Sequence, residues 1–171
     1  MTKIHVTEKV NRTPVDFFVS YAHKNREVAE RFMDELMEIL HPSKTYEYKV
    51  WMDSAIVVGD EWRKQILAAR DKCSFGLLLV SPAFLGSNFI SNEELPYFVG
   101  EQRAPSIPVM LSKVDLKLHD LKGLDELQIF RYMGKRFTEP RSYTECRKGH
   151  TRSEFVFSLF QAIEAKLSLH H

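Results

Sequence analysis

The chain has 171 residues, enough for one domain with a substantial hydrophobic core. Its 24 basic and 23 acidic side chains leave a formal charge of +1, which gives no support for binding to nucleic acid or to an acidic membrane surface. No segment approaches the roughly 20 apolar residues of a membrane span, and residues 1–14 lack the apolar core of a signal peptide. Two distant cysteines without metal-ligand spacing fit a reducing compartment, so we expect a cytoplasmic location.

The first predicted element is a buried strand at residues 15–21, VDFFVSY, which are aromatic, β-branched and almost continuously apolar. An amphipathic helix follows, with Asn25 as its N-cap and the sequence HPS at its end. The apolar face of this helix contains Val28, Phe32, Leu36 and Ile39. Residues 46–53, YEYKVWMD, predict a second strand.

A second helix is predicted after the loop SAIVVGD, with Asp60 as its N-cap. Its apolar face contains Trp62, Ile66, Ala69 and Cys73. Residues 75–81, FGLLLVS, are apolar almost throughout and predict a central strand that is covered on both faces. The stretch SPAFLGSNFISNEELP, residues 81–96, then leads into a short helix around residues 93–102.

Two further strands are predicted, at residues 107–111 (IPVML) and 127–132 (LQIFRY). Residues 133–150 show no clear period and predict a loop, before a last helix from about Ser153. The buried face of that helix contains Val156, Phe160, Ile163 and Leu167. This alternation predicts an α/β protein, a flavodoxin-like three-layer sandwich with a five-stranded parallel sheet in the order 2-1-3-4-5.

Ligands of such sheets bind outside the carboxyl ends of the strands, which here carry the sequences SYAHKN, DSAIVVGD and SPAFLGSN. A phospho-acceptor receiver domain needs an aspartate after the third strand, where this chain has Val80, Ser81 and Pro82. No GxGxxG, GxxxxGK[ST] or GxSxG motif occurs, and the seven histidines lack metal-ligand spacing. The common dinucleotide, P-loop, hydrolase and metal sites are therefore not predicted.

Taken together, the strand ends resemble those of a known family, the Toll/interleukin-1 receptor (TIR) domain of the prokaryotic type. The segments that carry the resemblance are DFFVSYAHKN (16–25), VWMDSAIVVGDEWRKQI (50–66), FGLLLVSPAFLGSNFISNEELP (75–96) and IPVML (107–111), together with Gln-Ile-Phe of the predicted fifth strand. We accordingly divide the chain into an N-terminal extension, residues 1–14, and a TIR domain, residues 15–168. The resemblance implies a flavodoxin-like fold, assembly with other TIR domains and, in many prokaryotic members, cleavage or cyclisation of NAD.

Cleavage of the nicotinamide–ribose bond passes through an oxocarbenium-like transition state, which a carboxylate beside the ribose stabilises. The family's catalytic glutamate lies a few residues after an aromatic residue, here Phe89, and directly before an aliphatic one. Glu94, which precedes Leu95, fits this motif, whereas Glu93 fits the spacing of a related form. We predict Glu94 as the catalytic residue, although Phe89 and Ile90 replace the usual Trp and Cys.

A structural role for Glu94 is the competing interpretation. Ser91 and Glu94 have the spacing of a capping box, in which the two side chains satisfy backbone amides at the start of a helix. Pro96 argues against it, because a helix that begins at Ser91 would place proline where a backbone donor is needed.

The resemblance also implies contacts between NAD and the strand ends. Tyr21, Ala22 and His23 are expected to contact the ribose or phosphates, with a half-buried core position and a solvated loop position as the alternatives for Tyr21 and His23. Asp53 contacts the ligand or fixes the following loop. Ser87 and Phe89 complete the predicted NAD site. Trp62 matches the family's Gly-Asp-x-Trp, and packing is its favoured role.

Residues 54–60 include four consecutive apolar residues, which are costly at a sheet end unless they cover a ligand or meet another subunit. In the family this is the assembly loop. The resulting prediction is an NAD-consuming TIR domain without a metal, activated by self-assembly, in bacterial defence against phage or in interference with host signalling. The alternative is a non-catalytic module that binds other TIR domains, with Glu94 as a helix cap.

Overall fold

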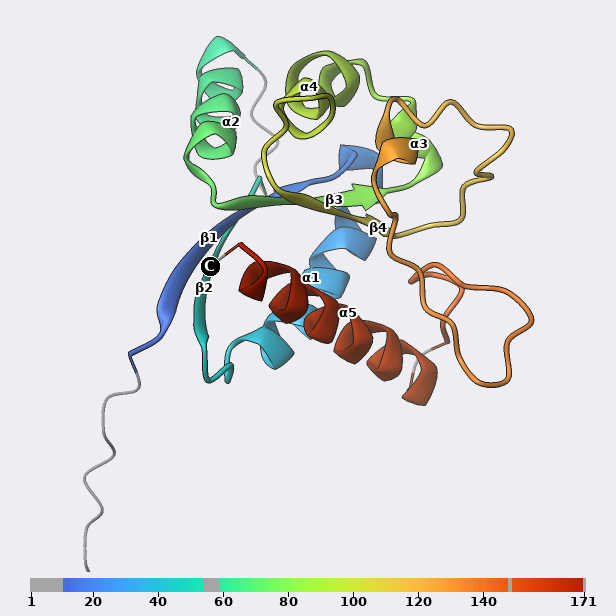
Figure 1. The fold of residues 1–171 in the computed structure, drawn as a ribbon. Helices are drawn as coiled ribbons and strands as arrows, with labels where there is room; N and C mark the ends of the chain where they lie inside the picture. Colours follow the sequence, from blue (N-terminus) through green and yellow to red (C-terminus); the bar gives the residue numbers. More distant parts are fainter. Residues whose placement is uncertain (1–10, 54–58, 148, 171) are drawn as a thin grey trace, which may run out of the picture.

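The computed structural model describes residues 11–53, 59–147 and 149–170, and within them a parallel β-sheet lies between two layers of helices (Figure 1). The four strands are β1 (Thr13–Ser20), β2 (Tyr46–Met52), β3 (Phe75–Val80) and β4 (Ser106–Met110). All are parallel and lie in the order β2-β1-β3-β4. The sheet starts at Thr13, two residues before the predicted domain boundary, because Thr13 pairs with Tyr46.

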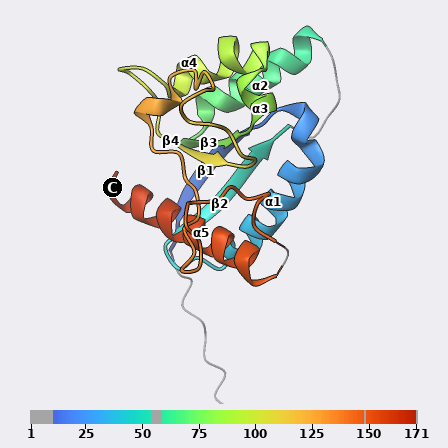
Figure 2. The same ribbon diagram turned by 90° about the vertical axis from the view of Figure 1, so that its right-hand side faces the viewer.

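One face of the sheet is covered by α1 (Arg26–Leu40) and α5 (His150–Ser168). The other face is covered by α2 (Asp60–Lys72), α3 (Pro82–Leu85) and α4 (Leu95–Phe98), as the rotated view in Figure 2 also shows. Successive residues of a strand point to opposite faces, so Phe17 and Leu77 enter the first core and Phe18 and Leu78 enter the second. The three-layer α/β arrangement is therefore confirmed.

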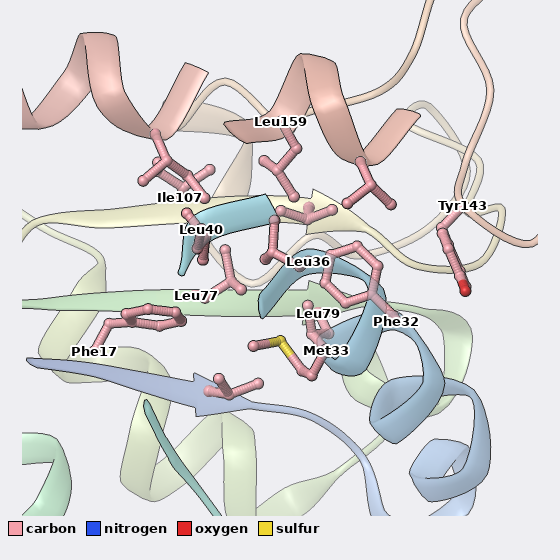
Figure 3. Close-up of a cluster of buried hydrophobic side chains, with 14 of the residues drawn as sticks. Phe17, Phe32, Met33, Leu36, Leu40, Leu77, Leu79, Ile107, Tyr143 and Leu159 are labelled. Carbon is pink, nitrogen blue, oxygen red and sulfur yellow. The ribbon is translucent and has the colours of Figure 1, made fainter. Parts of the chain in front are cut away.

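The core under α1 and α5 holds most of the aromatic side chains that the sequence predicts to be buried. Phe32 and Leu36 of α1 pack against Leu159 of α5 and against the strand residues Leu77 and Leu79 (Figure 3). Val28 and Ile39 lie at the margin of this core and are only partly buried. Burying large apolar side chains on both faces is the main source of stability in a sheet of this kind.

The predicted fifth strand is wrong for the described residues. Of residues 127–132 only Phe130 bridges β4: its N–H donates to the Pro108 carbonyl at 2.7 Å, and its carbonyl accepts from Met110 N–H at 2.9 Å. The 3-10 helix Leu124–Glu126 ends just before this segment, and Tyr132 turns away to form an antiparallel bridge with Arg141. Too few residues remain between the 3-10 helix and the Tyr132–Arg141 bridge to form further strand pairing with β4.

Of the two predicted helix caps, Asn25 is found at the N-cap position of α1, but its side chain makes no cap hydrogen bond. Asn25 also ends a short 3-10 helix, His23–Asn25, and its Oδ1 accepts a hydrogen bond of 2.6 Å from Ser81 Oγ, which ties the end of β1 to the end of β3. The predicted Asp60 cap is wrong. Asp60 is the first residue of α2, and Gly59 occupies the cap position without a side chain to bond. The last helix begins at His150, three residues before the predicted start.

The predicted helix at residues 93–102 is replaced by two short pieces. A π-helical turn, Ile90–Glu94, closes with a bond from Leu95 N–H to the Ile90 carbonyl, and α4 follows directly. Pro96 has no N–H to donate to the carbonyl of Asn92, as a continuous α-helix would require. π-helical turns are rare and are often found at functional sites.

Candidate active site

A cavity of about 190 Å³ opens at the carboxyl ends of β1 and β2, between these ends, α2 and the π-helical turn. All seven residues predicted for the NAD site line it: Tyr21, Ala22, His23, Asp53, Ser87, Phe89 and Glu94. The remaining lining residues are Phe18, Val19, Trp51, Trp62, Ile66 and Ile90. Because parallel strands end at the same edge of a sheet, segments that are far apart in sequence meet here.

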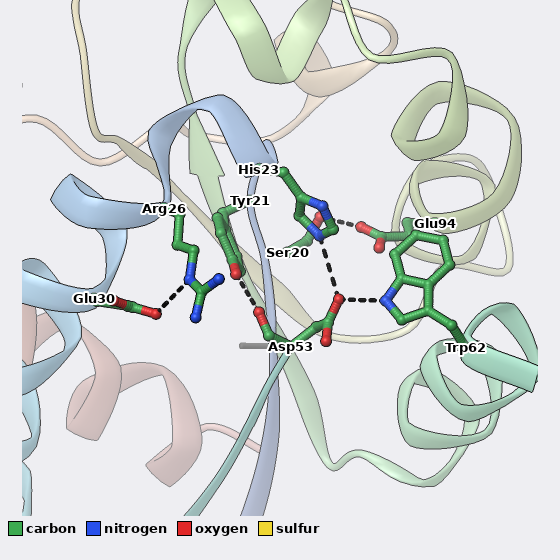
Figure 4. Close-up of polar contacts among 8 residues, drawn as sticks. All are labelled: Ser20, Tyr21, His23, Arg26, Glu30, Asp53, Trp62 and Glu94. Atoms are coloured by element: carbon green, nitrogen blue, oxygen red, sulfur yellow. Dashed lines mark hydrogen bonds and ion pairs between the residues drawn. The ribbon is translucent and has the colours of Figure 1, made fainter. Parts of the chain in front are cut away.

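Glu94 is the only buried acidic residue in the described part of the chain, with 5% of its surface exposed. The Ser20 hydroxyl, at the end of β1, donates a hydrogen bond to Glu94 Oε2 (Figure 4). Burial raises the pKa of Glu94 to about 7, while the Ser20 hydrogen bond and the charge of Arg70 lower it and the charge of Asp53 raises it. A carboxyl group in this environment changes its charge near neutral pH.

Glu93 points away from the cavity, toward α2. Its carboxylate forms an ion pair with Arg63, and its backbone carbonyl accepts a hydrogen bond from Arg70. Adjacent residues of a helical turn differ in direction by about 100°, so the two glutamates cannot both face the cavity. The described geometry thus places Glu94, and not Glu93, in the cavity wall.

The capping alternative for Glu94 is wrong. Ser91 lies inside the π-helical turn, where its N–H donates to the Ser87 carbonyl at 3.0 Å. Neither Ser91 nor Glu94 makes a side-chain cap bond at the π-helical turn or at α4, and Glu94 bonds to Ser20 on a different element. Glu94 therefore has no capping role that would explain the cost of burying its carboxyl group.

Asp53 connects three parts of the site. Its carboxylate accepts a hydrogen bond of 2.5 Å from Trp62 Nε1 of α2 and lies 3.2 Å from His23 Nε2, while its carbonyl accepts from the Tyr21 hydroxyl (Figure 4). Burial, followed by the Asp53 charge, raises the pKa of Tyr21 to about 12, so this residue is a neutral phenol at physiological pH. Asp53 thereby fixes the end of β2 to the loop after β1 and to α2.

Aromatic rings form one wall of the cavity. The ring centroids of Trp62 and Phe89 are 5.1 Å apart, and His23 meets Trp62 edge-on at 5.6 Å. Trp51 also lines the cavity and is stacked on Phe18, with ring centroids 5.2 Å apart. Such a wall suits a flat, electron-poor ring.

The remaining predicted residues sit at the edge of the cavity. Ser87 Oγ accepts from Ile90 N–H at 3.3 Å and so starts the π-helical turn, and Ala22 is buried, with its carbonyl bonded to Asn25 N–H at 2.8 Å. His23 is half exposed, with 49% of its side chain accessible. Of the predicted loop 54–60, residues 54–58 lie outside the described part of the chain.

Two contributors to the site are not predicted from the sequence. Ser20, the last residue of β1, belongs to a predicted strand, and its hydroxyl at the strand end is the signal that points to the cavity. Trp51 is predicted only as a strand residue. Trp62 packs against the core as predicted, and it also lines the cavity and bonds to Asp53.

The parallel sheet and the cavity at its strand ends define an α/β protein consistent with a flavodoxin-like fold. The sequence profile of the TIR domain matches residues 17–142, well over half of the chain, and the chain belongs to this family. No curated protein and no solved structure gives a significant match. TIR domains interact with other TIR domains, so a partner of this class is expected from family membership.

Clusters of metal ligands and membrane-spanning helices are both absent from the described residues. No group of three or more His, Cys, Asp or Glu side chains in residues 11–53, 59–147 and 149–170 could hold a metal ion. Among the helices in these same ranges, none is long and apolar enough to cross a membrane.

Proposed function

We propose that this TIR domain cleaves the nicotinamide–ribose bond of NAD, with Glu94 as the catalytic residue. The observation that carries the proposal is a buried carboxyl group in the wall of a cavity that aromatic side chains also line, where it has no capping role. Burying an ionisable group of this kind costs free energy, and proteins tolerate that cost mainly at functional sites.

The chemistry needs one well-placed negative charge. When the bond breaks, both electrons go to the nicotinamide nitrogen, neutral nicotinamide leaves, and C1′ of the ribose becomes positive. An ionised Glu94 carboxylate beside the ribose stabilises this charge in a site from which most water is excluded. Attack by water then gives ADP-ribose and one proton, whereas attack by an adenine nitrogen gives a cyclic product.

The other residues of the cavity supply binding. Phe89 and Trp62 form a wall for the nicotinamide ring, while Tyr21, Ala22, His23, Asp53 and Ser87 border the space for the ribose and phosphates. A volume of about 190 Å³ is below the 300 Å³ or more that is typical of sites enclosing a whole drug-sized ligand. We therefore place only the nicotinamide-ribose end of NAD inside the cavity.

Self-assembly is proposed as the activating step. The apolar residues of the loop 54–60 follow Asp53 directly, and Asp53 lines the cavity, so a neighbouring domain that contacts this loop would stand next to the site. We propose signalling in bacterial immunity, or interference with host signalling, as the biological setting. The cytoplasm is the compartment in which such a protein meets NAD.

The alternative function is that of a TIR domain that only binds other TIR domains. In this alternative Glu94 would be a helix cap. The side chain of Glu94 instead accepts a hydrogen bond from Ser20 and makes no cap bond, which argues against that role. The geometry favours the enzyme.

The proposal is tested by incubating concentrated protein with NAD and following nicotinamide release. We expect turnover by the wild-type protein, a loss of about 100-fold or more in Glu94→Gln, and near-normal turnover in the matched variant Glu93→Gln. If the wild-type protein releases no nicotinamide even when assembled by crowding, the binding-module alternative is correct. If only Glu93→Gln loses turnover, the catalytic assignment is wrong.

A further inference from the structure

Two arginines on one face of α2 hold the π-helical turn that carries Glu94. Arg63 and Arg70 are seven residues apart, which is within about 20° of two full helical turns, so their side chains leave the helix in nearly the same direction. Arg63 pairs with the Glu93 carboxylate, whereas Arg70 Nη1 donates to the Glu93 backbone carbonyl. The second contact holds the main chain itself, one residue before Glu94.

Arg70 also contacts the chain on the far side of Glu94. Its guanidinium carbon lies 4.9 Å from the centre of the Tyr97 ring in α4, a distance typical of a cation–π contact. Its Nε and Nη2 donate to Asp71 Oδ1 at 2.8 and 2.6 Å, which fixes the plane of the guanidinium. Only 17% of the Arg70 side chain is exposed. The Arg70 guanidinium therefore contacts the backbone of Glu93, just before Glu94, and the ring of Tyr97, just after it.

We propose that Arg70 is a positioning residue: by clamping the π-helical turn on both sides of Glu94, it fixes the direction in which the Glu94 carboxylate enters the cavity. Arg70 does not line the cavity, so it acts on Glu94 through the turn. The importance of this clamp for turnover rests on the proposed function, but the effect of the Arg70 charge on Glu94 can be measured without NAD.

Arg63 is a weaker part of the same contact. Half of its side chain is exposed, and its pairing is with the Glu93 side chain and not with the backbone. Exposed ion pairs of this kind contribute little to stability. We therefore expect Glu93→Gln, which keeps the carbonyl that Arg70 binds, to leave the turn in place.

The pKa of Glu94 responds to Arg70, because polar and charged groups on three parts of the chain act on the Glu94 carboxyl group. Arg70 of α2 and the Ser20 hydroxyl of β1 lower the pKa of Glu94, whereas Asp53, at the end of β2, raises it. Tyr21 and His23 also line the cavity. Removing the Arg70 charge alone should therefore raise the pKa of Glu94, while a change confined to overall stability should not move it.

The experiment compares Arg70→Met, which keeps the length of the side chain but loses its charge and donors, with Arg70→Lys, which keeps the charge but loses the planar fork. Lys64→Met removes an exposed cation of the same helix and is the matched control. The carboxyl carbon of Glu94 is titrated by NMR in protein labelled with ¹³C-glutamate, and its signal is identified by its loss in Glu94→Gln. kcat and KM for nicotinamide release are measured on the same samples.

We expect the Glu94 midpoint to rise by about 0.5 pH unit or more in Arg70→Met and to stay at the wild-type value in Arg70→Lys and Lys64→Met. We expect kcat to fall about tenfold in both Arg70 variants with little change in KM, because a misdirected carboxylate loses transition-state stabilisation and not ground-state binding. An unshifted midpoint in folded Arg70→Met, or a wild-type kcat in Arg70→Lys, would overturn the proposal. If the wild-type protein does not cleave NAD, the proposed function fails, and the NMR titration still decides whether the charge of Arg70 lies close enough to act on Glu94.

Discussion

The Ser20 hydroxyl donates a hydrogen bond to the Glu94 carboxylate and so joins the end of β1 to the π-helical turn. The bond favours the ionised form of a carboxyl group whose pKa burial raises to about 7. Ser20 and burial thus act in opposite directions on the same proton, and their balance sets the pH at which Glu94 becomes charged.

Ser20→Ala should raise the pKa of Glu94, because it removes a donor that stabilises the charged form while burial remains. We expect an upward shift of about one pH unit in the NMR titration, with lower turnover at pH 7 that recovers partly at pH 9. Ser20→Thr keeps the hydroxyl and is the matched control. Equal titration midpoints in wild-type protein and Ser20→Ala would show that the bond has no electrostatic role.

Asp53→Asn should have the opposite effect on Glu94. The Asp53 charge raises the pKa of Glu94, so its removal should lower the midpoint, although the asparagine oxygen can still accept from Trp62 Nε1. The same variant alters the 3.2 Å contact between the Asp53 carboxylate and His23 Nε2, and binding of NAD is expected to weaken. The NMR titration checks the first effect and KM the second; a midpoint that moves upward would contradict the assignment of Asp53.

Glu94→Gln should stabilise the fold above neutral pH. Because the folded-state pKa of Glu94 is raised, its contribution to stability is fully present below the unfolded value near 4.5 and is lost as pH rises through about 7. At pH 8 the buried carboxylate therefore costs on the order of 3 kcal/mol. Glutamine has no such cost and can still accept from Ser20.

Urea unfolding at pH 5 and pH 8 measures this cost. The gain in free energy of unfolding for Glu94→Gln over wild type should be large at pH 8 and small at pH 5. Glu93→Gln alters the neighbouring, partly exposed carboxylate and should show no comparable gain. A gain that is the same at both pH values would mean that the folded protein does not bury an ionised Glu94.

Trp62→Leu should weaken binding more than it slows chemistry. The indole ring of Trp62 lies beside the Phe89 ring in the wall of the cavity, and its Nε1 donates a hydrogen bond to Asp53. Leucine at this position would remove both the flat surface and the donor. We expect KM for NAD to rise between about threefold and tenfold, with a smaller rise for Trp62→Phe, which keeps a ring. A fall in kcat at unchanged KM would place Trp62 with the reacting atoms instead of the binding wall.

The sequence predicted the strands and helices whose side chains have a strong period. Residues 15–21 and 75–81 are short apolar runs rich in residues typical of buried strands, and the 3.6-residue spacing of apolar residues in α1 is typical of an amphipathic helix. Topology indicated the edge of the sheet where a site would lie, and the resemblance to the TIR family indicated Tyr21, Asp53 and Ser87, which line one cavity there. Local pattern and global fold agree at these positions.

Features that depend on tertiary contacts could not be predicted in the same way. LQIFRY has the composition of a strand, but flanking turns leave only Phe130 paired with β4. The π-helical turn at Ile90–Glu94 arises from Pro96 together with contacts from α2, and no periodicity reveals it. The bond between Ser20 and Glu94 joins residues 74 positions apart, which a strand pattern and a motif do not connect.

The central claim, that ionised Glu94 drives cleavage of NAD, is tested most directly by the pH dependence of kcat/KM for nicotinamide release. We expect kcat/KM to rise with pH through a midpoint near 7. The NMR titration of Glu94 in the free protein should have the same midpoint. A rate that does not change between pH 5 and pH 9, or a midpoint that differs from that of the Glu94 titration, would contradict it.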